Sequence, residues 1–130
     1  MSGTKPLRVG WIGAGTHATE MLLPQLTRRD VVLAALCELD QERLARIGAR
    51  FGVAEADRTR DAAALLARTD LDAIGMAVGP RQHVEFSIAA LARGLPVFIE
   101  KPPGASAADA RRIAEASQKA GKPVIVGFMK

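Results

Sequence analysis

The chain has 130 residues, 48% of them hydrophobic and 25% charged, as is ordinary for one globular domain covering residues 1–130. Its net charge of +4 comes from scattered basic residues without interleaved aromatics, which argues against a nucleic acid partner. Cys37 is the only cysteine, residues 1–6 carry no apolar leader, and no apolar stretch reaches the roughly 20 residues of a membrane span. These features predict a cytoplasmic protein with no intrachain disulfide and no membrane partner.

A short apolar run at residues 9–12 stops at two glycines, Gly13 and Gly15. Such runs are typical of buried parallel strands, and residues 18–23 suit a helix. Strand, glycine turn and helix in this order present backbone N–H groups and a helix N-terminus to a phosphate. Ala18 takes the third position of the G-x-G-x-x-G/A pattern. Taken alone, the pattern is equally compatible with a plain glycine-rich turn.

The rest of the chain alternates between strand and helix patterns. Apolar runs predict five more strands, at residues 31–37, 53–56, 71–78, 96–99 and 124–128. Helices are predicted after the N-cap residues Asp40, Asp61 and Ser106, and over residues 82–93. Pro24 should kink or restart the first helix.

This alternation predicts an α/β fold, a doubly wound parallel sheet (Rossmann fold) of about six strands with helices on both faces. The strand order 3-2-1-4-5-6 of such sheets places a ligand crevice at the carboxyl ends of strands 1 and 4. The glycine turn lies at that edge. The fold therefore favours a nucleotide or dinucleotide site built around the turn.

An acid, Glu38, comes at the end of the second predicted strand. A carboxylate at this place can accept hydrogen bonds from the adenosine ribose hydroxyls of a dinucleotide, and it would repel a 2′-phosphate. The predicted cofactor is therefore NAD, with NADP disfavoured. The alternative is an ordinary acid in a surface loop.

Two histidines and a lysine are further candidates near this edge. His17 follows the glycine turn, where it either contacts the cofactor or has a structural part, and His83 opens the helix after the fourth strand. His83 either helps to form a nicotinamide pocket or is a surface residue of the first helical turn. Lys101 follows Glu100 at the end of the fifth strand, where a lysine can polarise or protonate a substrate oxygen during hydride transfer. An exposed loop lysine is the alternative.

Five segments carry a resemblance to a known family: VGWIGAG at 9–15, CELDQER at 37–43, LDAI at 71–74, GLPVFIEKP at 94–102 and VGF at 126–128. In order and spacing, with His83 between the third and fourth, they resemble the N-terminal domain of the glucose–fructose oxidoreductase/inositol dehydrogenase/MocA (Gfo/Idh/MocA) family. The resemblance implies an NAD-binding domain of an oxidoreductase that transfers a hydride between nicotinamide and a sugar, polyol or related substrate.

By this resemblance, Lys101 is the active-site lysine, and no metal site is expected. The implied cofactor-binding residues are Gly13, Ala14, Gly15, Thr16, His17, Glu38, Val78, Gly79, His83, Glu100 and Lys101.

Two departures from the family pattern matter. The family usually has Pro followed by Asn or Pro where this chain has Gly79 and Pro80. If the Asn is the usual cofactor contact, Pro80 cannot replace its side-chain bonds. Family enzymes also continue into a larger α/β domain that carries the substrate pocket. We therefore expect a cofactor domain that does not turn over alone and that forms oligomers only with its second domain.

Two other function classes stay open at this point. A non-catalytic NAD-sensing module would have the same fold, but the retained Lys101 argues against it. A methyltransferase also pairs a glycine turn with an acid after strand 2, although its turn typically follows an acidic residue in strand 1, where this chain has only residues 9–12 of the apolar run. The sequence leaves the substrate and the direction of the reaction undetermined.

Overall fold

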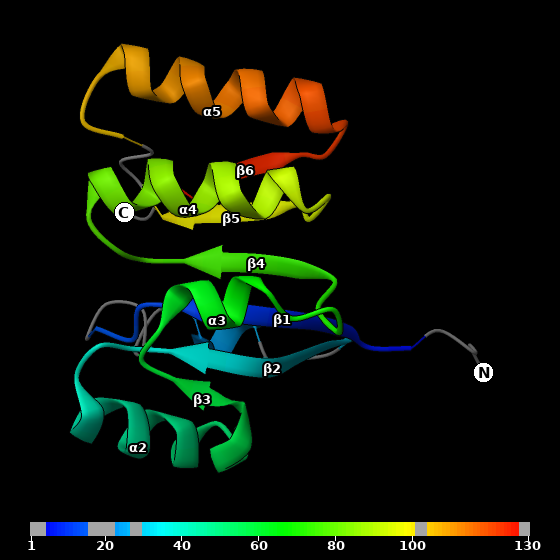
Figure 1. Ribbon diagram of the computed structural model, residues 1–130. Coiled ribbons are helices and arrows are strands. Elements are labelled where there is room, and N and C mark those ends of the chain that lie inside the picture. Colours follow the sequence, from blue (N-terminus) through cyan, green and yellow to red (C-terminus); the bar gives the residue numbers. More distant parts are fainter. Residues whose placement is uncertain (1–4, 16–22, 27–29, 101–103, 128–130) are drawn as a thin grey trace. The chain divides into compact units, whose positions relative to one another are not determined.

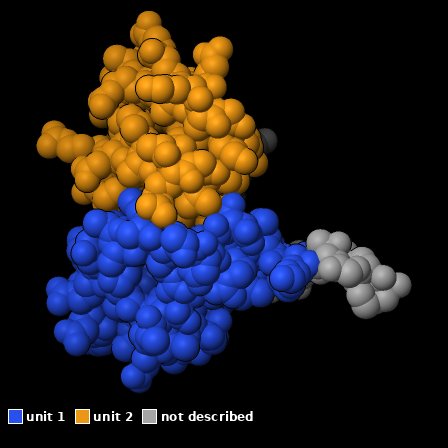
Figure 2. Space-filling view, turned by 45° about the vertical axis from the view of Figure 1, so that its right-hand side comes forward, with its two compact units in different colours: residues 1–72 blue, residues 73–130 orange. Residues whose placement is uncertain are grey.

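The computed structural model describes residues 5–15, 23–26, 30–100 and 104–127. The chain divides into two compact units, Met1–Asp72 and Ala73–Lys130 (Figure 2). In the described residues, each unit contains three strands, and the strand pairings within each unit are parallel. The predicted alternation of strands and helices with parallel pairing is therefore found within both units (Figure 1).

The strands of the first unit are β1 (Leu7–Ile12), β2 (Val31–Cys37) and β3 (Arg58–Thr59), in the order β3-β2-β1. β1 and β2 pair from Leu7 opposite Val31 to Ile12 opposite Cys37, with one shift of register after Val9. Their carboxyl-terminal halves are buried and form the core of this unit. Both strands therefore end side by side, immediately before the glycine turn and Glu38 respectively.

The α-helices described in this unit are α1 (Leu23–Leu26), which contains Pro24, α2 (Gln41–Arg50) and α3 (Ala62–Leu66). Local capping residues set the starts of α2 and α3. As predicted, the side chain of Asp40 accepts a hydrogen bond from the Arg43 N–H at 2.9 Å, and Asp61 accepts from the Ala63 N–H at 3.0 Å. The backbone hydrogen bond from Arg43 also lowers the pKa of Asp40. α2 thus begins three residues after Glu38.

The strand predicted at residues 53–56 is wrong. Residues Glu55–Asp57 form a short 3-10 helix, η2, and β3 begins only at Arg58. The apolar residue that suggested a strand, Val53, instead closes the end of α2: its N–H bonds the Gly48 carbonyl at 2.8 Å, while Gly52 adopts a left-handed φ of 72°. This is a Schellman ending, in which a buried apolar residue after the glycine covers the last helical turn.

The second unit contains β4 (Ala73–Met76), β5 (Val97–Glu100) and β6 (Val124–Gly127), in the order β4-β5-β6. Its helices α4 (Pro80–Ala92) and α5 (Ala107–Ala120) pack side by side (Figure 1). α5 has the predicted Ser106 cap. β4 is shorter than the predicted 71–78, and α4 begins at Pro80, a residue suited to the first helical position because it has no N–H to leave unpaired.

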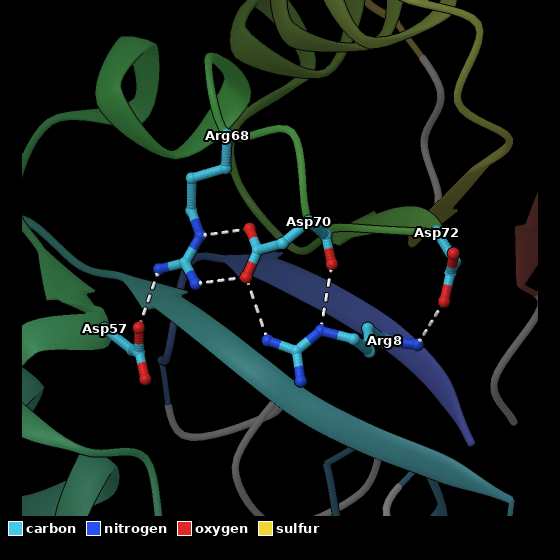
Figure 3. A network of polar contacts seen from close by, with 5 residues as sticks. All are labelled: Arg8, Asp57, Arg68, Asp70 and Asp72. Carbon is cyan, nitrogen blue, oxygen red and sulfur yellow. Dashed lines mark hydrogen bonds and ion pairs between the residues drawn. The ribbon is translucent and has the colours of Figure 1, made fainter. Parts of the chain in front are cut away.

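A network of polar contacts joins β1 to the segment after α3 within the first unit (Figure 3). The guanidinium of Arg8 lies 2.9 Å from the Asp70 carboxylate, and its backbone N–H donates to Asp72 at 2.8 Å. Arg68 contacts the same carboxylate of Asp70 at 2.7 Å and reaches Asp57 at 3.0 Å. The side-chain hydrogen bond from Arg68, followed by that from Arg8, holds the pKa of Asp70 well below its usual range.

Replacing Asp70 is expected to cost a small, pH-dependent amount of stability. Because the pair is exposed and screened, Asp70→Asn should lower the free energy of unfolding by about 0.5–1 kcal/mol at neutral pH. Because the pKa of Asp70 is lowered in the folded state, its carboxylate stabilises the fold fully at pH values above the unfolded-state pKa of about 3.9. This stabilisation declines as the pH falls below that pKa. Urea unfolding should therefore show a smaller gap between wild type and variant at about pH 3 than at about pH 7.

The matched control for Asp70 is Glu115→Gln, at an exposed acid of α5 for which the described residues record no ion pair. This change should leave the unfolding free energy nearly unaltered at both pH values. A gap between wild type and Asp70→Asn that widens in acid would contradict the role assigned to the network.

Candidate cofactor-binding site

The turn after β1 is held from two sides. Gly13 has a φ of 96°, a left-handed value that favours glycine, and its N–H donates to the Cys37 carbonyl at the end of β2 at 2.8 Å. The indole N–H of Trp11, which is only 1% exposed, donates to the carbonyl of Gly13 at 2.6 Å. The turn is therefore anchored to the neighbouring strand and to a buried side chain before any ligand arrives.

Glu38 lies directly against this turn. The side chain is 9% exposed, and its Oε1 accepts the N–H of Ala14 at 2.8 Å. Its Oε2 accepts the N–H of Asp40 at 2.9 Å and lies 3.8 Å from Nη1 of Arg43. The structure thus brings together the predicted phosphate turn and the predicted ribose acid. The reading of Glu38 as an ordinary surface acid is wrong, because burial and two backbone donors hold this carboxylate in place.

Gly15 is the part of the described turn that is open to a ligand. The amides of Gly13 and Ala14 are bonded within the protein, whereas the described residues record no acceptor for the amide of Gly15. A Cβ added at Gly15 would meet no atom within 4 Å. Among the described residues, this amide and the approach to it are therefore available to a phosphate group.

His83 and the backbone of Val78 and Gly79 form a second cluster, in the unit of residues 73–130. Gly79 is the N-cap of α4, and the Val78 N–H donates to Nε2 of His83 at 3.0 Å. His83 is only 1% exposed, so the alternative prediction that it is a surface residue is wrong. The imidazole lies beneath the segment predicted to contact the cofactor and holds that segment by its backbone.

The other predicted site residues are placed as follows. Glu100 is the last residue of β5, is partly exposed and pairs in register with Gly127. Thr16, His17 and Lys101 lie outside the described residues.

Two further features limit the chemistry of the described residues. Burial, followed by the charges of Asp61 and Glu38, raises the pKa of the Cys37 thiol to about 11, so the thiol stays protonated at neutral pH. Within residues 5–15, 23–26, 30–100 and 104–127, no three His, Cys, Asp or Glu side chains are grouped to hold a metal ion. In the same parts of the chain, no helix has the length and apolar character needed to cross a membrane.

Sequence reasoning missed two residues of this site. Trp11 entered the pattern only as part of an apolar strand, and Arg43 only as part of a family segment. A tryptophan just before a glycine turn is a usable signal, because a buried indole N–H needs an acceptor and an exposed turn carbonyl can supply one. Arg43 has no comparable signal, because its approach to Glu38 depends on where α2 begins.

The sequence profile of an oxidoreductase family with an NAD-binding Rossmann fold matches residues 7–128. The chain belongs to the Gfo/Idh/MocA oxidoreductase family. This match confirms the predicted doubly wound Rossmann fold and the assignment to NAD-binding oxidoreductases.

Named relatives of the Gfo/Idh/MocA family agree with this assignment. An inositol 2-dehydrogenase from Klebsiella pneumoniae is 35% identical over 95% of this chain and 37% of its own length. A solved oxidoreductase from Agrobacterium radiobacter, in complex with NAD+, L-tartaric acid and magnesium, matches 94% of this chain and 35% of its own with a TM-score of 0.86 and 29% identity. A 3-ketoreductase from Actinomadura kijaniata, solved with NADP and TDP-benzene, matches 95% of this chain and 39% of its own with the same TM-score and identity.

The chain spans about 37% of the length of the inositol dehydrogenase that it matches. The chain is thus the NAD-binding part of a Gfo/Idh/MocA oxidoreductase.

Proposed function

We propose that this chain is the NAD-binding half of an oxidoreductase that transfers a hydride between a nicotinamide cofactor and a sugar, polyol or related substrate. The observation that carries the proposal is the contact between Glu38 and the glycine turn, with Oε1 of Glu38 2.8 Å from the N of Ala14. This contact supports the proposal because a dinucleotide requires a ribose acceptor beside a phosphate-binding turn. The substrate class rests on the relatives, among them an inositol 2-dehydrogenase.

Residues of the first unit take the adenosine and pyrophosphate end of the cofactor. The open amide of Gly15, together with the turn from Gly13 through Thr16 to His17, binds the pyrophosphate. Glu38 accepts the ribose hydroxyls. Its charge, together with its fixed position, disfavours a 2′-phosphate and so favours NAD over NADP.

The residues that follow β4 and β5 would hold the nicotinamide end. The backbone of Val78 and Gly79 would contact the ring, and His83 fixes that backbone through the hydrogen bond that it accepts from the Val78 N–H. Glu100 and Lys101 follow β5, and Lys101 moves a proton to or from the substrate oxygen. When bound, the nicotinamide supplies the hydride acceptor or donor of the reaction.

A binding titration tests this proposal. In a calorimeter, the purified chain should bind NAD with a saturable heat, and S-adenosylmethionine at the same concentrations should give none. Because Trp11 is the only tryptophan and contacts the turn, its fluorescence should change along the same NAD titration curve. Binding of S-adenosylmethionine in place of NAD would contradict the proposal and support a methyltransferase.

A further inference from the structure

Glu38 bridges two backbone segments that lie far apart in the sequence. One carboxylate oxygen accepts the N–H of Ala14 in the glycine turn, and the other accepts the N–H of Asp40 at the entry to α2. The two ends of this bridge differ in their surroundings, because Ala14 is 1% exposed and Asp40 is exposed. Without Glu38, water can replace the acceptor of the exposed Asp40 amide, whereas the buried Ala14 amide would lose the acceptor that Glu38 gives it.

We propose that Glu38 is a positioning residue for the phosphate-binding turn, in addition to its role as acceptor for the ribose. Gly13 is already anchored through its N–H to Cys37 and through its carbonyl to Trp11. The bond from Ala14 to Glu38 is the next anchor along the turn and the last described one before the open amide of Gly15. It therefore sets the direction in which the Gly15 amide faces the phosphate. This inference rests on the proposed function, which supplies the phosphate ligand.

The two roles are compatible because a carboxylate has room for both. Each carboxylate oxygen offers about two lone-pair directions, and each oxygen of Glu38 uses one of them for a backbone N–H. The second direction of Oε1 can accept a ribose hydroxyl without breaking the bond to Ala14, while Oε2 also has Nη1 of Arg43 at 3.8 Å. Ribose binding and orientation of the turn therefore depend on the same side chain, and both contribute to the affinity for the cofactor.

Two substitutions of equal charge separate the roles. Glu38→Gln removes the charge but keeps one carbonyl oxygen, which should stay on the Ala14 N–H, because that amide has no access to water. Glu38→Ala removes the charge and the acceptor together. Both variants remove the negative charge, so both reduce the repulsion of an anionic ligand equally. A difference in affinity or amide exchange between them therefore reports the hydrogen bond to Ala14.

The first measurement is amide hydrogen exchange of the ligand-free chain by NMR. The Ala14 amide should exchange about tenfold faster or more in Glu38→Ala than in wild type, and Glu38→Gln should restore most of the protection. The Val53 amide, bonded to Gly48 at the end of α2, is the internal control and should be unchanged in all three proteins. Equal exchange of Ala14 in all three proteins would overturn the proposal.

The second measurement uses 2′,3′-dideoxy-ADP, a diphosphate without ribose hydroxyls, with ADP as the comparison. Glu38→Ala should bind the dideoxy ligand about 3- to 10-fold more weakly than Glu38→Gln, the scale of one hydrogen bond. Equal affinities of the two variants for this ligand would leave Glu38 with the ribose role alone and overturn the proposal. Failure of the wild-type chain to bind either ADP or NAD would contradict the proposed function instead, and the exchange of Ala14 would then decide the positioning role.

Discussion

The 130-residue chain is expected to bind NAD and to produce no NADH when sugars or polyols are added. Binding follows from the turn and Glu38, which together contain the groups for the adenosine and pyrophosphate end. Turnover also requires a surface that holds the substrate carbon against the nicotinamide. Positioning of this kind is worth roughly 7–11 kcal/mol of the barrier, or about 10⁵-fold or more in rate.

This expectation rests on the coverage of the relatives: the chain spans 37% of the length of the inositol dehydrogenase that it matches. The measurement is NADH absorbance over a panel of sugars and polyols, at NAD concentrations that calorimetry shows to be saturating. The inositol 2-dehydrogenase from Klebsiella pneumoniae, assayed at its full length, is the comparison. Saturable, substrate-dependent NADH formation by the 130-residue chain would show that its own residues complete the active site.

Glu38→Ala is expected to weaken NAD binding by about 1–3 kcal/mol, roughly 5- to 150-fold, because hydrogen bonds to a charged group are lost. NADP should bind the wild-type chain more weakly than NAD, since its 2′-phosphate would meet the buried carboxylate. In the variant, the difference between the affinities for NAD and NADP should become smaller or change sign. Arg43 lies 3.8 Å from Oε2 of Glu38, so removal of the carboxylate leaves this guanidinium available to a phosphate.

Arg43→Gln supplies the control for cofactor choice. Alone, it should change NAD affinity little, because Arg43 is 39% exposed and its pair with Glu38 is long. In the double variant, Arg43→Gln should abolish the gain in NADP affinity, relative to NAD, that Glu38→Ala alone produces. Equal or tighter binding of NADP by the unmodified chain would contradict the role of Glu38; NADP is the cofactor in the solved complex of the 3-ketoreductase.

Several features of this protein follow from the sequence alone because they depend on short-range interactions. The caps at Asp40, Asp61 and Ser106 each bond an amide two or three residues ahead, so a pattern of neighbours is enough to predict them. The strands β1 and β2 are apolar runs, and their ends mark where the glycine turn and Glu38 begin. The family and its cofactor follow from motifs at these same positions.

The tertiary structure decided what depends on residues distant in the sequence. The bond between Glu38 and Ala14 joins residues 24 apart, and it exists because β1 and β2 end in register, with Ile12 opposite Cys37. The third strand lies at Arg58 because a strand is defined by its partner, here Leu36 of β2, while the more apolar Val53 covers a helix end. His83 is buried because α4 packs back on β4, where Ser87 contacts Met76, and this packing does not follow from the local pattern around His83.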